Sequence, residues 1–137
     1  MRVVFDTNVL LVSLPSHSPF RALYQAVIDE RLTLYVTTEM LAEYEEQISR
    51  RLGIARTDVQ LRELLNLPAV QEITVYYQWH LLAEIDADDD KFVDCAVACG
   101  VDYLVTNDRH FNRLQEIPFP VVNIIKAEDF LELLKNI

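Results

Sequence analysis

Two aspartates occupy the same place relative to two apolar segments of the chain. Asp6 comes directly after Val3-Val4-Phe5, and Asp108 comes two residues after the end of Leu104-Val105-Thr106. Continuous apolar runs of this length predict strands that are buried on both faces of a parallel sheet. In such a sheet, ligand sites form outside the carboxyl ends of the strands. We therefore expect both carboxylates at one edge of the sheet.

A third acidic group begins a predicted helix. Asp88, Asp89 and Asp90 start the helix expected over 88–99, and the stretch 84–94 contains six acidic residues and one lysine. Acidic residues at a helix start complement the helix dipole, which accounts for one or two of the three but not for Asp6 and Asp108. Carboxylates packed this densely repel each other unless cations bind.

The expected cation follows from the ligand chemistry. Carboxylate oxygens are hard ligands, so they suit Mg²⁺ or Mn²⁺ better than zinc or copper. An ion in such a site lowers the pKa of its bound water and neutralises the charge of a phosphate, which suits the hydrolysis of a phosphodiester. The acidic pattern thus indicates a metal-dependent phosphodiesterase.

Length and composition restrict the remaining possibilities. The 137 residues predict a single domain over 1–137, and 51% hydrophobic residues exclude a disordered chain. A net charge of −10 argues against a protein that holds nucleic acid by bulk charge, and two glycines exclude glycine-rich phosphate loops. Without a membrane-length apolar run, a signal peptide or a disulfide framework, a cytoplasmic protein is expected.

The elements that must position these residues alternate along the chain. Strands are expected over 2–5, 32–36, 73–82, 103–106 and 121–125. Helices are expected over 9–14, 20–28, 38–52, 57–67, 88–99 and 127–134, with Gly53 ending the third and a Thr57–Gln60 capping box beginning the fourth. This alternation predicts a three-layer α/β/α fold with a central, mostly parallel sheet.

Four motifs in this order resemble a known family. They are Phe5-Asp6-Thr7-Asn8-Val9-Leu10, Leu41-Ala42-Glu43-Tyr44, Asp88-Asp89-Asp90-Lys91-Phe92 and Tyr103-Leu104-Val105-Thr106-Asn107-Asp108. Over essentially the whole chain, the sequence is similar to PIN-domain ribonucleases, in particular to the single-domain PIN toxins of bacterial toxin–antitoxin pairs. The resemblance implies a metal-dependent endonuclease that cleaves single-stranded or structured RNA. It also implies a homodimer and a small antitoxin protein as a partner.

The resemblance implies a set of four acids as catalytic and metal-binding residues: Asp6, Glu43, Asp90 and Asp108. Asp6 and Asp90 match the direct ligands of the family, whereas Glu43 and Asp108 match acids that more often act through water. Thr7 and Asn8 match the polar pair after the first acid, where Asn8 would orient Asp6 or a phosphate. Asn107 stands beside Asp108 in a similar role.

Two of these positions have rivals within the sequence. Glu45 lies in the apolar helical stripe of Leu41, Tyr44, Ile48 and Leu52, whereas Glu43 lies outside it, so Glu45 is an alternative second acid. The third acid can be Asp88, Asp89, Asp90 or Asp94. Asp90 is favoured, with Asp94 as an auxiliary on the same helical face.

The residues that would grip RNA are less distinct. Arg50, Arg51, Arg56 and Arg62 surround Gly53 and form either an RNA-binding arm or a solvated helix hairpin. Arg109 and Arg113 follow Asp108, where they can meet a phosphate near the metal. The aromatic residues Tyr76, Tyr77 and Trp79 would stack on bases, or would pack in the core or in a dimer interface.

Two other classes of function compete with the ribonuclease. A phosphotransfer enzyme would use a strand-end Asp as its nucleophile, but the sequence lacks a second Asp two positions after Asp6 and a lysine at a strand end. A non-catalytic RNA- or partner-binding module of the same fold would suit the strong negative charge. It would require an incomplete set of acids, and the set here is complete.

Overall fold

The centre of the protein is a five-stranded sheet in which every neighbouring pair is parallel. The computed structural model describes residues 1–137 and contains β1 (Arg2–Phe5), β2 (Thr33–Val36), β3 (Val70–Glu72), β4 (Tyr103–Val105) and β5 (Ile124–Ile125). Their order across the sheet is β3-β2-β1-β4-β5. The middle strand β1 is buried on both faces, since Val3, Val4 and Phe5 have no exposed surface. This is the parallel sheet that the apolar runs predict.

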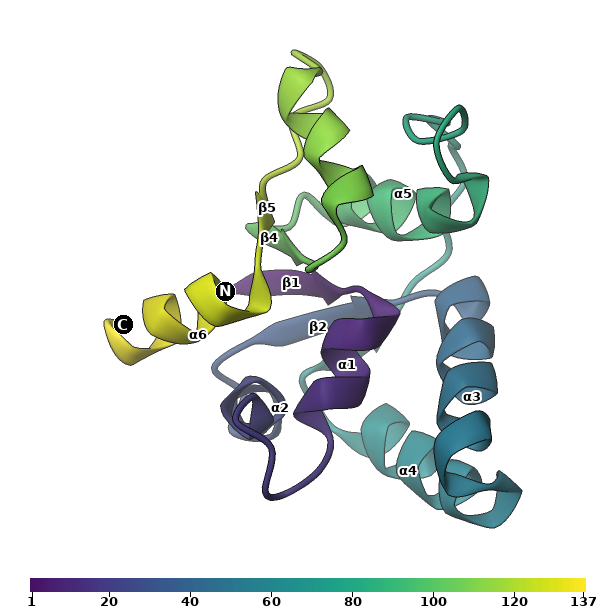
Figure 1. Ribbon diagram of the computed structural model, residues 1–137, viewed down its shortest axis with the longest axis vertical. Helices are drawn as coiled ribbons and strands as arrows, with labels where there is room; N and C mark the ends of the chain where they lie inside the picture. Colours follow the sequence, from purple (N-terminus) through teal and green to yellow (C-terminus); the bar gives the residue numbers. More distant parts are fainter.

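Helices cover both faces of this sheet (Figure 1). They are α1 (Thr7–Ser13), α2 (Arg21–Ile28), α3 (Thr38–Leu52), α4 (Ile54–Asn66), α5 (Asp90–Cys99) and α6 (Ala127–Lys135), with 3₁₀ helices η1 (Ala87–Asp89) and η2 (Arg109–Glu116). In Figure 1, α5 lies above the sheet, whereas α1, α2 and α4 lie below it. The predicted three-layer α/β/α architecture is therefore confirmed. None of these helices combines the length and apolar character needed to span a membrane.

The order of the strands determines where a site can form. From β1 the chain moves to β2 and β3 on one side of the sheet, and then crosses β1 to add β4 and β5 on the other side. The strands that follow β1 are added on one side of it and the later strands on the other, so the order of the strands reverses between β1 and β4. Ligands bind outside the carboxyl ends of the strands at such a switch point. Asp6 and Asp108 follow these two strands.

Two local predictions are wrong, and one short helix is absent from the predicted elements. The strand expected over 73–82 is wrong, because the strand in this part of the chain, β3, ends at Glu72. The residues that follow it run outside the sheet, and Tyr76 is 93% exposed. The Thr57–Gln60 capping box is wrong as well. The helix α4 already begins at Ile54, and the Thr57 hydroxyl donates to the carbonyl of Gly53 from inside the helix. The 3₁₀ helix η2 was not expected.

Candidate active site

Asp6 is held at the junction of β1, α1 and β4. Its Oδ1 accepts a hydrogen bond from the backbone N–H of Thr7 at 2.7 Å, so its side chain caps the helix α1. Its Oδ2 accepts a hydrogen bond from the Thr106 hydroxyl at 2.8 Å, and Thr106 directly follows β4. The residue is 6% exposed. Two strand ends and a helix start therefore determine the orientation of this carboxylate.

The surroundings of Asp6 disfavour its negative charge. Burial is the main reason that its pKa is raised above the ordinary value, and the nearby charges of Glu43 and Asp108 raise it further. The hydrogen bonds from Thr106 and Thr7 act in the opposite direction but do not cancel the effect. A buried carboxylate beside two other carboxylates is stabilised when a cation is added to it.

Glu43 joins this group from the helix α3. Its Oε2 accepts a hydrogen bond from the Thr7 hydroxyl, and its Oε1 forms an ion pair with the Lys91 ammonium at 2.8 Å. The buried Tyr44 next to it donates a hydrogen bond from its hydroxyl to the Phe5 carbonyl at 2.6 Å, which ties α3 to the end of β1. The rival Glu45 is exposed to solvent. The structure thus brings Glu43, and not Glu45, to Asp6.

Asp108 enters from the end of β4. Its backbone N–H donates to the Thr106 hydroxyl at 3.0 Å, and that hydroxyl also contacts Asp6. Its Oδ1 accepts a hydrogen bond from the backbone N–H of His110 at 2.9 Å and caps η2. Thr106 therefore positions both strand-end aspartates.

Asp89 is the fourth acid that the fold brings to this edge. Burial raises its pKa to about 7, and the charges of Asp86, Asp6 and Asp108 contribute to the shift. Asp86 caps η1 by accepting from the backbone N–H of Asp88. The ligand atoms of Asp86, Asp89 and His110 all lie within 4.8 Å of one another. Asp89 therefore lies among carboxylates that come from its own segment, from the end of β1 and from the segment after β4.

Asp90 and Asp94 make different contacts. The Oδ1 of Asp90 accepts a hydrogen bond from the backbone N–H of Leu82 at 2.8 Å, and the Oδ1 of Asp94 accepts one from the backbone N–H of Trp79 at 3.0 Å. Both aspartates are buried on α5 and hold the irregular segment 73–86 against it. The choice of Asp90 as third acid stays a prediction, and its Oδ2 is the oxygen that remains for a ligand.

The polar residues predicted to lie beside the acids also differ in their contacts. Thr7 contacts Glu43, as described above, and Asn8 is exposed beside Asp6. Asn107 has a structural contact, because its Oδ1 accepts a hydrogen bond from the backbone N–H of Ala127 at the start of α6. Arg109 is exposed and lines a shallow hollow with Thr106 and Asp108. It can therefore reach a phosphate near Asp108.

Two residues beside Asp89, namely Asp86 and His110, are not predicted from the sequence. Asp86 lies within the acidic stretch 84–94, two residues before the expected helix start at Asp88. His110 is adjacent to Asp108 in the sequence and is exposed in the structure. Its Nδ1 lies 3.5 Å from Asp108 Oδ1. The density of acidic residues over 84–94 is a sequence signal that could have identified Asp86. No pattern in the sequence identifies His110.

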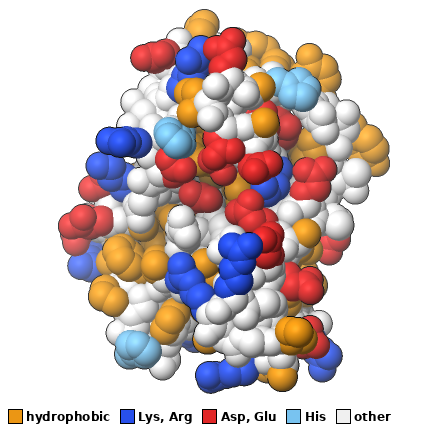
Figure 2. Space-filling model, turned by 45° about the vertical axis from the view of Figure 1, so that its right-hand side comes forward, with side chains coloured by type: hydrophobic (Ala, Val, Ile, Leu, Met, Phe, Trp, Pro, Cys, Tyr) orange, Lys and Arg blue, Asp and Glu red, His pale blue; other side chains and the backbone are white.

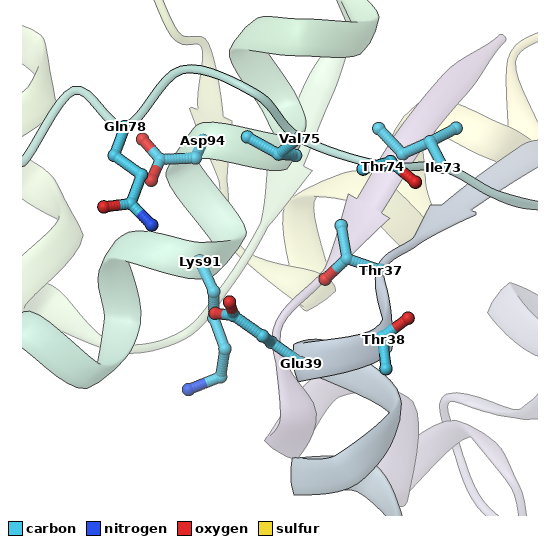
Figure 3. Close-up of a pocket in the computed structure, with 9 residues that line it drawn as sticks. All are labelled: Thr37, Thr38, Glu39, Ile73, Thr74, Val75, Gln78, Lys91 and Asp94. Carbon is cyan, nitrogen blue, oxygen red and sulfur yellow. The ribbon is translucent and has the colours of Figure 1, made fainter.

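The residues Asp6, Glu43, Asp89 and Asp108 are called the acid cluster below. A polar cleft lies beside it, between the start of α3, the segment 73–78 and α5 (Figure 3). Glu39, Gln78, Lys91 and Asp94 line it together with Thr37 and Thr74. Lys91 borders both this cleft and the acid cluster through its ion pair with Glu43. The cleft therefore gives a polar path along one side of the cluster.

The donor set fits a hard divalent cation. Asp6, Glu43, Asp89 and Asp108 offer only carboxylate oxygens, and the charges of these groups raise the pKa values of Asp6 and Asp89. Oxygen ligands of this kind suit Mg²⁺ or Mn²⁺. Figure 2 shows acidic side chains gathered at the middle of one face, with basic side chains beside and below them. This face can hold a cation and accept an anionic substrate next to it.

The raised pKa of Asp89 predicts how the stability of the metal-free protein depends on pH. The folded protein holds this proton up to about pH 7, whereas an ordinary aspartate loses it near 3.8. The proton on Asp89 therefore contributes to the stability of the folded protein, fully below about pH 4, and this contribution is lost as the pH rises to about 7. We expect the free energy of unfolding, measured by urea titration in EDTA, to fall across this range. The fall should be smaller for Asp89→Asn, and equal falls in both proteins would contradict the assignment.

Comparisons with known proteins agree with this geometry. A family model described as "PIN domain" matches residues 2–110. Among solved structures, VapBC2 from Rickettsia felis bound to a DNA fragment from its promoter matches with a TM-score of 0.67 and 18% identity, over 92% of this chain and 98% of that chain. FitAcB from Neisseria gonorrhoeae matches with a TM-score of 0.62 and 18% identity, over the same shares.

A third solved structure, VapBC-1 from nontypeable Haemophilus influenzae, matches with a TM-score of 0.63 and 14% identity, over 93% of this chain and 99% of that chain. No curated protein sequence matches the chain. The structural matches show the same fold at low identity, and the family model covers most of the sequence, including Asp6, Glu43 and Asp108. The chain belongs to the PIN-domain family.

Proposed function

We propose that this protein is a metal-dependent endoribonuclease. The observation that carries the proposal is the convergence of Asp6, Glu43, Asp89 and Asp108 at the carboxyl edge of the sheet. These acids come from the end of β1, from α3, from η1 and from the end of β4. A single carboxylate is common on any surface, whereas one buried and three half-buried carboxylates from four segments are stabilised by a positive partner charge. The PIN-domain family supports a nuclease as the general class.

The proposed ligands of the cation are the same four acids, with Asp90 Oδ2 as the alternative to Asp89. When bound, Mg²⁺ or Mn²⁺ would lower the pKa of water and neutralise the charge of the phosphate under attack. Residues of the chain would position the carboxylates and bind the substrate. Thr106 and Thr7 hold the carboxylates of Asp6 and Glu43 in place through their hydroxyls. Arg109 and Asn8 are exposed at the rim and would bind a phosphate of the RNA.

RNA as the substrate rests on the resemblance to PIN-domain ribonucleases, and it can be tested directly. An RNA and a DNA strand of the same sequence should be incubated with the protein and Mn²⁺. We expect internal cleavage of the RNA and much slower cleavage of the DNA. Equal cleavage of both strands would indicate a general nuclease. If neither strand is cut, the protein is instead a non-catalytic binding module, which its net charge of −10 favours.

We also propose that the protein is the toxin of a toxin–antitoxin pair, acts as a homodimer and works in the cytoplasm. Solved structures with the same fold are VapBC assemblies from several bacteria, which supports a small protein partner. A groove between α1, α3 and α4 suits such a partner. Leu11, Leu14 and Leu52 line it together with Arg51 and Arg56. An apolar segment with acidic residues would match this lining in shape and charge.

The groove makes one prediction about the predicted arginine arm. Arg50 is paired with Glu46 on the surface of α3, whereas Arg51 and Arg56 are exposed and line the groove. We expect the double change Arg51→Glu, Arg56→Glu to abolish binding of the proposed antitoxin partner. RNA cleavage should persist, because the acids are untouched. Binding should be measured by calorimetry with Arg62→Glu as the control; loss of RNA affinity instead would make the groove an RNA path.

A further inference from the structure

Lys91 is the only lysine or arginine that forms an ion pair with one of the acids Asp6, Glu43, Asp89 and Asp108. It lies in the first turn of α5, and its side chain is 15% exposed. Its ammonium forms an ion pair with Glu43 Oε1 at 2.8 Å and donates to the backbone carbonyl of Asp88. Figure 3 shows the Lys91 side chain extending from α5 past the Glu39 side chain, which comes from the start of α3. Its charged group therefore bridges two of the segments that supply the acids.

The position of this charge has an electrostatic consequence. The Thr7 hydroxyl donates a hydrogen bond to Glu43, and the Thr7 backbone N–H donates one to Asp6. The carboxylate of Glu43 therefore contacts Lys91 with one oxygen and is linked through Thr7 to Asp6 by the other. A divalent cation at this cluster would approach the same carboxylate. Because Glu43 Oε1 already contacts an ammonium, the cation and Lys91 compete for the negative charge of Glu43.

We propose that Lys91 is a built-in counter-ion of the acid site, which pairs with Glu43 when the cation is absent and thereby lowers the affinity for the cation. This inference rests on the proposed function, because it assumes that the cluster binds a metal. Lys91 acts through Glu43 and is thus a positioning residue. It holds the empty cluster together and yields Glu43 when a divalent ion binds.

The test is the affinity for Mn²⁺, measured by calorimetry and by the metal-dependent shift in melting temperature, with no RNA present. We expect Lys91→Met to bind Mn²⁺ about tenfold more tightly than the wild type, because a competing positive charge is removed. Its melting temperature in EDTA should fall, because Glu43 loses its partner. Lys91→Arg keeps the charge and should behave like the wild type. Lys91→Gln, which keeps a hydrogen-bond donor, provides a second neutral variant if Lys91→Met folds poorly.

Two controls separate this effect from a general change in charge. Lys135→Met removes the same charge from an exposed ion pair with Glu132 at the end of α6, and should leave the Mn²⁺ affinity unchanged. In a Glu43→Gln background, the change Lys91→Met should no longer alter the affinity, because the group through which it acts is gone. A purely structural role for Lys91 would not raise the affinity in one background and leave it unchanged in the other.

The outcomes also separate this inference from the proposed function. Unchanged or weaker Mn²⁺ binding by Lys91→Met and Lys91→Gln, with the wild type binding normally, would overturn the role of Lys91 and leave the nuclease proposal in place. If neither the wild type nor these variants bind Mn²⁺, both are wrong. Binding by the neutral variants alone would support the inference most strongly, since Lys91 would then mask the site.

Discussion

The Asp6→Asn protein should fold as the wild type does and cleave RNA at about one hundredth of the wild-type rate or less. Even a change to a residue behind a metal ligand typically costs about 10- to 100-fold in activity. Asp6 is the one buried member of the acid cluster, and it accepts hydrogen bonds from the Thr7 backbone N–H and the Thr106 hydroxyl. An asparagine can keep both contacts, since its oxygen can cap α1 and its amide can donate to the Thr106 hydroxyl. It cannot supply the negative charge. Its effect should therefore appear in the cleavage rate and not in the fold.

The melting temperature in EDTA and the initial rate of RNA cleavage with Mn²⁺ are the two measurements needed. The Asp58→Asn variant is a matched control, because Asp58 is exposed on α4 and the same charge is lost. It should cleave RNA at the wild-type rate. A wild-type rate for Asp6→Asn would remove Asp6 from the mechanism.

Asp89→Asn should reduce the stabilisation by Mn²⁺ more than Asp90→Asn does. A ligand at about 100 times its dissociation constant stabilises a protein that binds it only when folded by about 2.7 kcal/mol. The charges of Asp6 and Asp108 act on Asp89, whereas Asp90 Oδ1 accepts a hydrogen bond from Leu82. An asparagine at position 90 can keep that bond. Both variants should therefore fold, and only the first should lose most of the metal-dependent shift in melting temperature.

The comparison distinguishes the two candidates for the third acid. A larger loss for Asp90→Asn would restore Asp90 as the ligand through its Oδ2 and leave Asp89 as a neighbouring acid. The exposed Asp88 serves as a control, because its carboxylate faces solvent beside both residues. Asp88→Asn should keep the full shift.

The sequence predicts the parts of the site that follow from strand geometry. Parallel strands end at one edge of a sheet, so the apolar runs before Asp6 and Asp108 are enough to bring these residues together. The structure adds Thr106 as the residue that links them. The ends of these strands can be predicted from the sequence, because a strand that is buried on both faces is an uninterrupted apolar run.

The contacts that involve the segment 73–86 could not be predicted in this way. Its aromatic residues are typical of strands, yet Tyr76 and Tyr77 are 93% and 64% exposed, and Trp79 contacts Tyr77 and Phe119 instead of a neighbouring strand. The backbone of this segment donates to Asp90 and Asp94. Which aspartate remains available for a metal therefore depends on a non-local contact that no periodicity reveals.

The choice between Glu43 and Glu45 shows a related limit. The apolar stripe of α3 identifies the side that packs on the core, and Tyr44 and Ile48 are buried as it predicts. An active site at the rim of a sheet lies beside that stripe and not within it. Glu43 meets Thr7 there, whereas Glu45 is exposed. Periodicity identifies the core side of a helix but not the residue that reaches the rim.

The most direct test of the proposed mechanism is the dependence of RNA cleavage on a divalent cation. The purified protein should be stripped with EDTA, dialysed and assayed on a single-stranded RNA, alone and after Mg²⁺ or Mn²⁺ is added back, with Asp6→Asn prepared in parallel to reveal contaminating nuclease. We expect no cleavage by the stripped protein, recovery on addition of either ion, and no recovery with Asp6→Asn. Cleavage by the wild type that continues unchanged in EDTA, with no cleavage by Asp6→Asn, would contradict the mechanism.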